Sequence, residues 1–229
     1  MTERGMIFNG EMVRALLDGR KTQTRRIVKG TDSAVKFCKE WNINGEEVFV
    51  VLGEKDHTGM NPVLGAISCP FGAVGNRIWV RETFQGPLFN YEQMDEYLED
   101  SSKFEKPEFC QYAADGGHRP EYQDADDNLR HGWRPSIHMP RWASRILLEI
   151  TDVRVERLNA INEHDAQAEG VAKLRGGFWK HYQPGWTQHQ LSARGSFVTL
   201  WKSIYGDESW NSNPWVWVIK FNRIEDLTA

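Results

Sequence analysis

The segment from Gly19 to Arg26 holds the residues of this chain whose types and spacing best suit chemistry. It reads GRKTQTRR and places one lysine, two threonines and three arginines within eight residues. Neighbouring positive charges favour the neutral form of a lysine, and a neutral lysine can be the base that activates a hydroxyl. Lys21 and Thr24 are therefore a candidate base and nucleophile. The same cations would suit a phosphate or an oxyanion, and the plainer interpretation is a solvated basic turn.

The elements around this segment decide which side chains meet. A capped helix with apolar residues at helical spacing is expected over 10–18, so the segment begins just beyond a helix end. Residues three apart share one face of a turn but lie on opposite faces of a strand. Lys21 and Thr24 therefore meet only if the segment is a turn. If it is extended, Lys21 points the same way as Gln23 and Arg25.

Glu169 is a carboxylate in an unusual position. It ends a short predicted helix that Asn162 can cap and Gly170 can stop. A negative charge in the last turn opposes the helix dipole, at a cost of roughly 0.3–1 kcal/mol. Glu169 is therefore a candidate site residue, and a solvent-exposed glutamate is the simpler alternative.

Glu82 is the second candidate carboxylate. It lies in RIWVRETF, a predicted strand over 77–84, and shares a face with the apolar residues of that strand. If that face is the core, Glu82 is buried and needs a partner, which Arg25, Arg26 or Arg141 could supply. A structural ion pair and a site residue remain equally open.

The loop 138–145 combines cations with an aromatic ring. It reads HMPRWASR and contains Arg141 and Trp142. Trp142, or Trp79 in the strand 77–84, could stack a nucleobase. A packed tryptophan beside surface arginines is the commoner explanation of such a loop.

Size and composition limit the class of protein. The 229 residues, 40% of them hydrophobic and 10 of them Trp, suffice for one large domain or two small ones. No window approaches the ~20 apolar residues of a membrane span, and the chain starts without an apolar signal region. Three scattered cysteines and no CxxC indicate reduced thiols, so we expect a cytoplasmic protein. No histidine motif predicts zinc, and no cofactor is expected.

The net charge of −4 is unevenly distributed. Residues 92–129 hold twelve acidic and three basic residues, a charge of −9, and the rest of the chain then carries −4 − (−9) = +5. A mildly basic body with an acidic insertion suits a local site for a small anionic or nucleotide ligand. A long basic stripe, as in a strong duplex binder, is not evident.

Hydrophobic patterns predict a mainly β chain with some α structure, an α+β fold. Strands are expected at 47–52, 77–84, 145–156 with a bulge near Thr151–Asp152, and 215–221; helices at 10–18, 162–169 and 197–204. A loop is expected over 175–195. Residues 86–132 read as an insertion with a helix near 90–99 and a short strand near 109–113. Strands joined by irregular connections favour one barrel-like domain over 1–229.

Several of these blocks together resemble the ASCH domain family of the PUA-like superfamily. The blocks are 17–26, the strand 146–156 with the following 158–170, and the closing strand 215–221. Residues 75–84 and 138–145 make the whole chain similar to phage and prophage members. The resemblance implies a PUA-like open β-barrel with short flanking helices and a nucleoside or RNA ligand.

The resemblance also implies an activity. Small bacterial relatives are amidohydrolases that remove the acetyl group from N4-acetylcytidine with a lysine, a threonine and a glutamate, which by motif fall on Lys21, Thr24 and Glu169. In the first hypothesis Thr24 attacks the amide carbonyl after Lys21 accepts its proton, and Glu169 protonates the leaving amine. Arg25 or Arg26 stabilises the oxyanion or docks a phosphate.

Two other functions remain open. A binding module could read a modified base or single-stranded RNA without chemistry, with Trp79, Glu82, Arg141 and Trp142 as further contacts. A phage accessory protein could instead bind a host protein through the acidic insertion.

Overall fold

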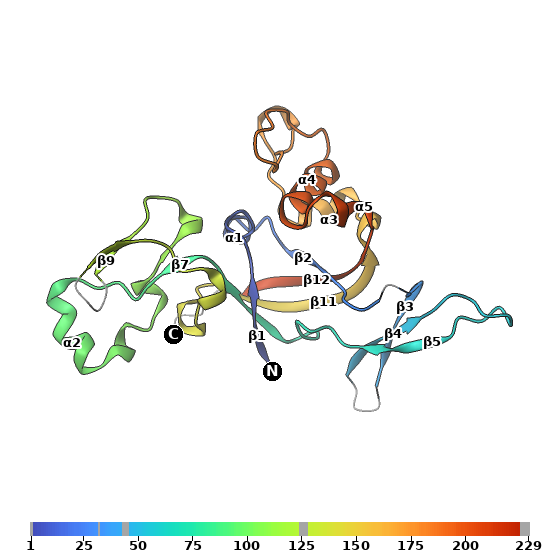
Figure 1. The fold of residues 1–229 in the computed structure, drawn as a ribbon, viewed down its shortest axis with the longest axis horizontal. Coiled ribbons are helices and arrows are strands. Elements are labelled where there is room, and N and C mark those ends of the chain that lie inside the picture. The colour runs from blue at the N-terminus through green and yellow to red at the C-terminus, as the bar shows by residue number, and fades with distance from the viewer. Residues whose placement is uncertain (1, 32, 43–45, 124–127, 225–229) are drawn as a thin grey trace.

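A computed structural model of the chain describes residues 2–31, 33–42, 46–123 and 128–224 (Figure 1). It has a mixed α+β fold, as expected, in which three lobes extend from a central sheet. The strands are β1 (Glu3–Ile7), β2 (Gln23–Ile27), β3 (Lys36–Trp41), β4 (Glu47–Leu52), β5 (Val63–Ile67), β6 (Arg77–Arg81), β7 (Phe84–Gln85), β8 (Gln111–Tyr112), β9 (Glu121–Gln123), β10 (Leu129–His131), β11 (Leu147–Arg157) and β12 (Trp215–Ile224). The α-helices are α1 (Gly10–Leu17), α2 (Met94–Glu99), α3 (Glu163–Ala168), α4 (Ala193–Tyr205) and α5 (Asp207–Asn211).

The central sheet has five strands in the order β1-β6-β11-β12-β2. β1 and β6 are parallel, and the other neighbours are antiparallel. Alternate residues of β12 enter two different cores: Trp217 and Ile219 join the main core with α1, whereas Val216 and Val218 pack beneath α3 and α4. Burial on both faces explains why the first five positions of this strand, Trp215 to Ile219, are all apolar.

The sheet does not close into a barrel. β1 and β2 are its two edges, and no ladder joins them among the described residues. The Arg26 side chain spans the opening: its Nη2 donates to the Ile7 carbonyl at 2.6 Å, and its guanidinium lies 5.2 Å from the centroid of the Phe8 ring. The predicted barrel is thus not confirmed, and a side chain takes the place of a closing ladder.

Local sequence signals place several elements correctly. Asn9 caps α1 by accepting from the Met12 N–H at 2.9 Å, and Gly19 follows the helix with φ 72°. Asn162 caps α3 in the same way. The register of β11 with β12 shifts between Ile150 and Asp152, which confirms the expected bulge. The predicted strand over 77–84 is interrupted, because β6 ends at Arg81 and β7 begins at Phe84.

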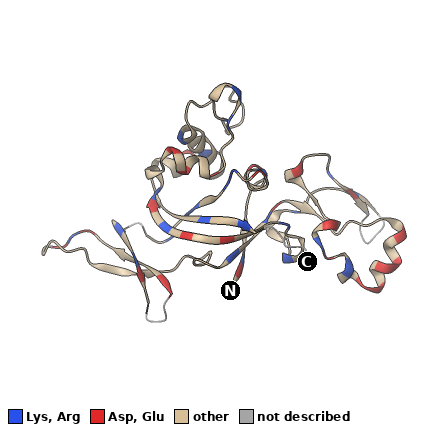
Figure 2. Cartoon of the chain, turned by 180° about the vertical axis from the view of Figure 1, so that it is seen from behind, with Lys and Arg blue, Asp and Glu red and all other residues tan. Residues whose placement is uncertain are grey.

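Residues 86–123 and 128–132 form a lobe at one end of the molecule (Figure 1), and Figure 2 shows acidic residues gathered along the α2 region. Phe104, Tyr112 and Ala114 of this segment are buried, so the insertion does not lie wholly on the surface. These apolar groups enter cores without desolvating the carboxylates, which occupy other positions, and Ala114 belongs to the main core. Asp124, Asp126 and Asp127, counted in the charge of the segment, lie outside the described residues.

The third lobe is an arm made of β3, β4 and β5, of which only β4 was expected. Two aromatic contacts fix its base to the sheet: Phe37 with Trp215 at 4.9 Å and Phe49 with Trp217 at 5.0 Å between ring centroids. The three cysteines are free thiols. No helix in the described part of the chain is long and apolar enough to cross a membrane.

Candidate active site

Lys21 and Glu169, 148 residues apart, are in direct contact. The Lys21 Nζ donates to the Glu169 Oε2 at 3.0 Å and to the Glu169 carbonyl at 2.9 Å. A backbone bridge also joins the two residues. Gly170, with φ 88°, makes this approach possible, because a Cβ there would lie 2.7 Å from the Cβ of Lys21.

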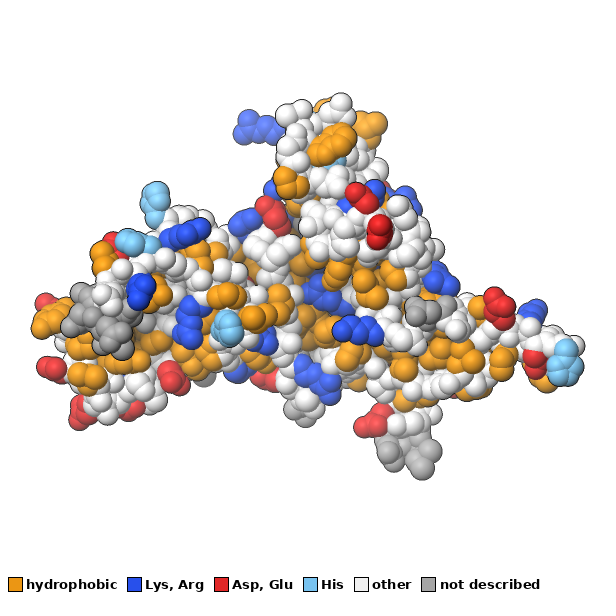
Figure 3. Space-filling model, viewed as in Figure 1, with side chains coloured by type: hydrophobic (Ala, Val, Ile, Leu, Met, Phe, Trp, Pro, Cys, Tyr) orange, Lys and Arg blue, Asp and Glu red, His pale blue; other side chains and the backbone are white. Residues whose placement is uncertain are grey.

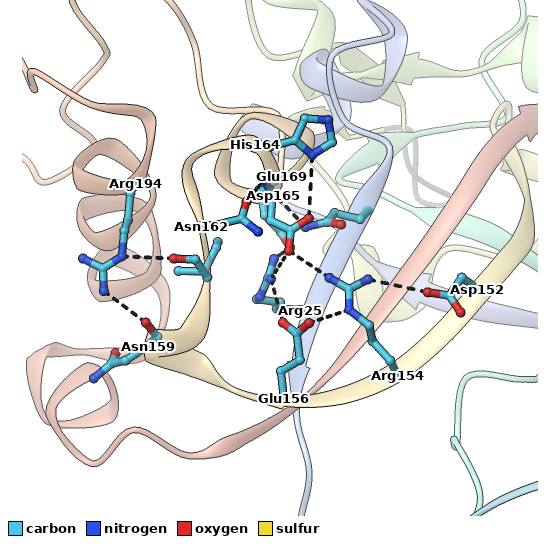
Figure 4. Close-up of polar contacts among 12 residues, drawn as sticks. Arg25, Asp152, Arg154, Glu156, Asn159, Asn162, His164, Asp165, Glu169 and Arg194 are labelled. Atoms are coloured by element: carbon cyan, nitrogen blue, oxygen red, sulfur yellow. Dashed lines mark hydrogen bonds and ion pairs between the residues drawn. The ribbon is translucent and has the colours of Figure 1, made fainter. Parts of the chain in front are cut away.

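Arg25 binds the other oxygen of the same carboxylate. Its Nη1 donates to the Glu169 Oε1 at 2.9 Å, and its Nη2 lies 3.2 Å from both Asp165 and Glu156 (Figure 4). Arg154 completes the cluster through the same two acids, at 2.8 and 2.5 Å. The alternating charges satisfy one another, so the cluster can lie between β2, β11 and α3 without an isolated buried charge.

Burial lowers the pKa of Lys21 below its ordinary value of 10.5. The attraction and hydrogen bond of Glu169 oppose this effect, and the positive charges of Arg26 and Arg25 add to it. The neutral amine that a general base requires is thereby favoured. The expectation that neighbouring cations act on Lys21 is correct in direction, but burial is the larger cause.

Thr24 faces away from this cluster. It is paired with Ile219 of the main core, whereas Arg25 is paired with Val218 beneath α3 and α4. Directly paired residues share a face and successive residues alternate, so Thr24 and Arg25 lie on opposite faces of β2. The segment is thus extended, and Lys21 shares its direction with Arg25, as the second of the two geometries predicts. The Thr24 hydroxyl is buried and has no hydrogen-bond partner among the described residues.

The remaining expected ligand-binding residues have other partners. Arg26 spans the open side of the sheet, as described above. Trp79 lies against Gly5 and under the Arg81 guanidinium, which is 5.4 Å from a ring centroid. Arg141 pairs with Glu3 at 2.9 Å. Trp142 packs against the small core around Phe84.

Glu82 is buried, as expected, but its partner is Arg145 and not Arg25, Arg26 or Arg141. Arg145 donates to both carboxylate oxygens at 2.9 and 3.1 Å. It also binds Asp115 at 2.6 and 2.8 Å and lies 3.9 Å from the centroid of the Tyr112 ring. Burial raises the pKa of Glu82 above its ordinary value of 4.5, and Arg145 opposes that rise.

Sequence reasoning missed the acids that hold Arg25. Glu156 and Arg154 lie two residues apart on β11, a spacing that puts both on one face of a strand. Asp165 lies three residues after the cap Asn162, and its own N–H is the one that the cap accepts. These spacings could have identified the acidic residues as candidates. Which cation each acid faces, however, depends on how β2 and α3 pack.

The three candidate catalytic residues are closed to solvent in this conformation. Lys21, Thr24 and Glu169 are 3%, 0% and 2% exposed. Two surface pockets, of about 410 and 480 Å³, are lined by none of these three residues. Within the described residues, no group of three or more His, Cys, Asp or Glu could hold a metal ion.

Comparisons with family models, with curated proteins and with solved structures found no match to this chain.

Proposed function

We propose that this chain is an ASCH-type amidohydrolase that removes an acyl group from the exocyclic amine of a modified nucleoside such as N4-acetylcytidine. The observation that carries the proposal is the buried hydrogen bond between Lys21 and Glu169. It joins an amine whose pKa burial lowers to a carboxylate 3.0 Å away, which is a path for a proton. Arg25, on the second carboxylate oxygen, fixes the orientation of Glu169.

The proposed reaction is a two-step acyl transfer. Neutral Lys21 takes the proton of the Thr24 hydroxyl while the Thr24 oxygen bonds to the acyl carbon. The proton passes from Lys21 to Glu169, which gives it to the exocyclic nitrogen as the carbon–nitrogen bond breaks. Water then hydrolyses the threonine ester, which releases the carboxylic acid and restores the hydroxyl.

This reaction requires the site to open. Lys21 points the same way as Arg25, whereas Thr24 lies on the opposite face of β2, and all three reacting groups are buried. Lys21 lies two residues before β2 and is held by Glu169 and Gly170, just beyond the end of α3. A movement of this short segment would release Lys21 toward Thr24 and admit the nucleoside.

A second candidate function is favoured by the direction of Thr24. If Thr24 and Lys21 remain on opposite faces, the cluster has no nucleophile, and the chain would bind a modified base without cleaving it. The closed ion pairs of Glu169 would then hold α3 against β2, and binding would depend on other surfaces.

Incubation of the protein with a panel of N4-acylated cytidines, followed by chromatography for released cytidine, tests the proposal. We expect cytidine from at least one member of the panel with wild-type protein and none with Lys21→Met. Lys180→Met is the matched control, because Lys180 pairs with Glu11 at the surface at 2.8 Å and lies outside the cluster. Binding of an acylated cytidine without release of cytidine would support the second candidate and contradict the first.

A further inference from the structure

The connection between α3 and α4 is a basic loop with an unusual composition. We define it as residues 172–192. It contains Lys173, Arg175 and Lys180, two histidines, and no Asp or Glu. The loop forms the outer part of the lobe that stands above the central sheet, at the top of Figure 1. Its charge is opposite to that of the acidic insertion at the other side of α1.

Aromatic side chains are exposed on this basic loop. Trp186 is 60% and Phe178 is 41% exposed. The Trp186 ring is stacked on His181, with centroids 5.2 Å apart and planes at 14°, and Phe178 lies 5.9 Å from His189. Figure 3 shows apolar side chains on the surface of this lobe, with a basic side chain projecting beside them. One face of the Trp186 ring is thus packed against His181, which fixes the plane of the ring.

The base of the loop is ordered by its own hydrogen bonds. Trp179 and Gln190 exchange two backbone hydrogen bonds, at 2.8 and 2.9 Å, and the Lys180 N–H donates to the Ala172 carbonyl at 2.9 Å. The Tyr182 hydroxyl accepts from the Ala172 N–H at 2.9 Å. The aromatic rings therefore project from a built hairpin-like frame, so a ligand that stacks on them need not order the whole loop.

Two cations of the loop have no acidic partner. Lys173 and Arg175 have no carboxylate oxygen within 4.0 Å among the described residues. Lys21, Arg25, Arg145 and Arg154, by contrast, are each paired with an acid. Lys173 lies 5.7 Å from the Trp179 ring centroid. These charges are available to an anion, and both precede the exposed rings in the sequence.

We propose that the basic loop binds single-stranded nucleic acid. Bases stack on Trp186 and Phe178, and backbone phosphates pair with Lys173 and Arg175. A stacking surface beside unpaired cations is the arrangement that single-stranded polynucleotides require, because every base has a flat face and every nucleotide carries a negative charge. A duplex hides its base faces, so the exposed rings favour a single strand.

The loop is also placed to serve the proposed site. It begins two residues after Gly170, which holds Lys21, and Lys180 binds Glu11 on α1 at 2.8 Å. A strand bound on the loop would therefore lie near the segment that must move to expose Lys21. This link, which makes a polymer the substrate, rests on the proposed function, whereas binding by the loop does not.

Fluorescence anisotropy with a labelled single-stranded 12-mer RNA at low salt tests the proposal. We expect Trp186→Ala to weaken binding roughly 5- to 150-fold, the effect of losing one stacked base. The double variant Lys173→Gln, Arg175→Gln should weaken binding and reduce its dependence on salt. Trp41→Ala is the matched control, because Trp41 is 66% exposed on the distant β3 arm, and it should bind as the wild type does.

Two further probes, a single-stranded DNA and a duplex, sharpen the result. The same sequence as DNA should bind if stacking and phosphates carry the affinity, and tighter binding of RNA would add a contact to the 2′-hydroxyl. A duplex should bind more weakly than either single strand. The proposal is overturned if the wild type does not bind the single strands, if Trp186→Ala and Trp41→Ala have equal effects, or if the duplex binds best.

The binding measurement separates this inference from the proposed function. Release of cytidine and binding of the 12-mer are measured separately on the same preparations of the wild type and of Trp186→Ala. If the wild type releases no cytidine but Trp186→Ala weakens binding, the proposed function fails and the basic loop stands. If cytidine is released but Trp186→Ala binds the 12-mer as the wild type does, the proposed function stands and the proposal for the basic loop fails.

Discussion

Glu169 and Glu82 are both buried glutamates that bind cations, yet their surroundings differ. Glu169 shares its two oxygens between a lysine and an arginine, Lys21 and Arg25. Glu82 gives both of its oxygens to one arginine, Arg145. An arginine stays charged at any ordinary pH, whereas a buried lysine can lose its proton. A proton can therefore pass between the carboxylate and its cation in the Glu169 cluster but not in the Glu82 cluster.

The two clusters also join different parts of the molecule. Arg145 links Glu82, just after β6, to Asp115 of the acidic insertion and lies on the Tyr112 ring, so it holds the insertion in place. Lys21 and Glu169 hold β2 against the end of α3, where the proposed site must open. The comparison teaches that burial of a carboxylate alone does not identify a site, and that the kind of cation it meets is more informative.

The largest expected difference between the clusters is in turnover. Lys21→Met should lower the rate of deacylation by about 10²–10⁴-fold, because it removes the general base. Glu82→Gln should leave the rate within a few-fold of wild type, since Glu82 belongs to the other cluster. Chromatographic rates on one acylated cytidine measure both. A greater loss in Glu82→Gln than in Lys21→Met would reverse the assignment of the two clusters.

The next effect is on stability. Arg25→Met should lower the free energy of unfolding by about 3–5 kcal/mol, because Arg25 is fully buried and binds three carboxylates. Arg145→Met should cost less, about 1–3 kcal/mol, since Asp115 can return to water. Urea denaturation of both variants gives the comparison. An equal or larger loss in Arg145→Met would show that the insertion contact is the stronger of the two.

The pH dependence of stability should have opposite signs at the two clusters. The folded pKa of Glu82 is raised, so the folded state binds more protons above pH 4.5, and its contribution to the free energy of unfolding falls as pH rises through that pKa. The folded pKa of Lys21 is lowered, so the unfolded state binds more protons just below pH 10.5, and stability rises with pH there. Each slope is at most about 1.4 kcal/mol per pH unit.

Urea midpoints measured across pH for wild type, Glu82→Gln and Lys21→Met check these slopes. Glu82→Gln should remove the decrease above pH 4.5, and Lys21→Met should remove the increase below pH 10.5. If either variant keeps the wild-type slope in its own window, the corresponding group does not titrate as described.

The smallest effect belongs to the exposed end of the Glu82 cluster. The Asp115 side chain is 47% exposed, so Asp115→Asn should lower the free energy of unfolding by about 1 kcal/mol or less. Asp18→Asn is a matched control, because Asp18 also pairs with an arginine, Arg20, and is 56% exposed. Thermal unfolding compares them. A loss from Asp115→Asn as large as that from Arg145→Met would show that the exposed Arg145–Asp115 pair provides most of the stability of the Glu82 cluster.

The sequence predicted helices and strands better than it predicted contacts between distant residues. Alternation and caps located β11, β12, α1 and α3, because those signals are local. The arm strand β5 could not be predicted, since its apolar residues Val63 and Leu64 are exposed and give no inward pattern.

Contacts within the sites depended on packing between distant segments. Only the family resemblance predicted that Lys21 and Glu169 share one site. Residue spacing did not decide whether the segment around Lys21 is a turn or a strand. Glu82 was expected to be buried, but Arg145 as its partner follows from the β6–β11 register, which places Leu147 opposite Trp79. Local patterns do not determine such a register.

The central claim is that Lys21 is a buried lysine with a lowered pKa, and an NMR titration of the lysine side chains tests it most directly. Lys21→Met assigns the signal, and Lys180→Met, which removes a surface lysine paired with Glu11, is the control that must leave that signal in place. We predict that the Lys21 Nζ titrates below 10.5, because burial outweighs its attraction to Glu169. A Lys21 signal that titrates at or above 10.5 would contradict the account, because the Lys21–Glu169 pair would then be a permanent ion pair with no base to offer.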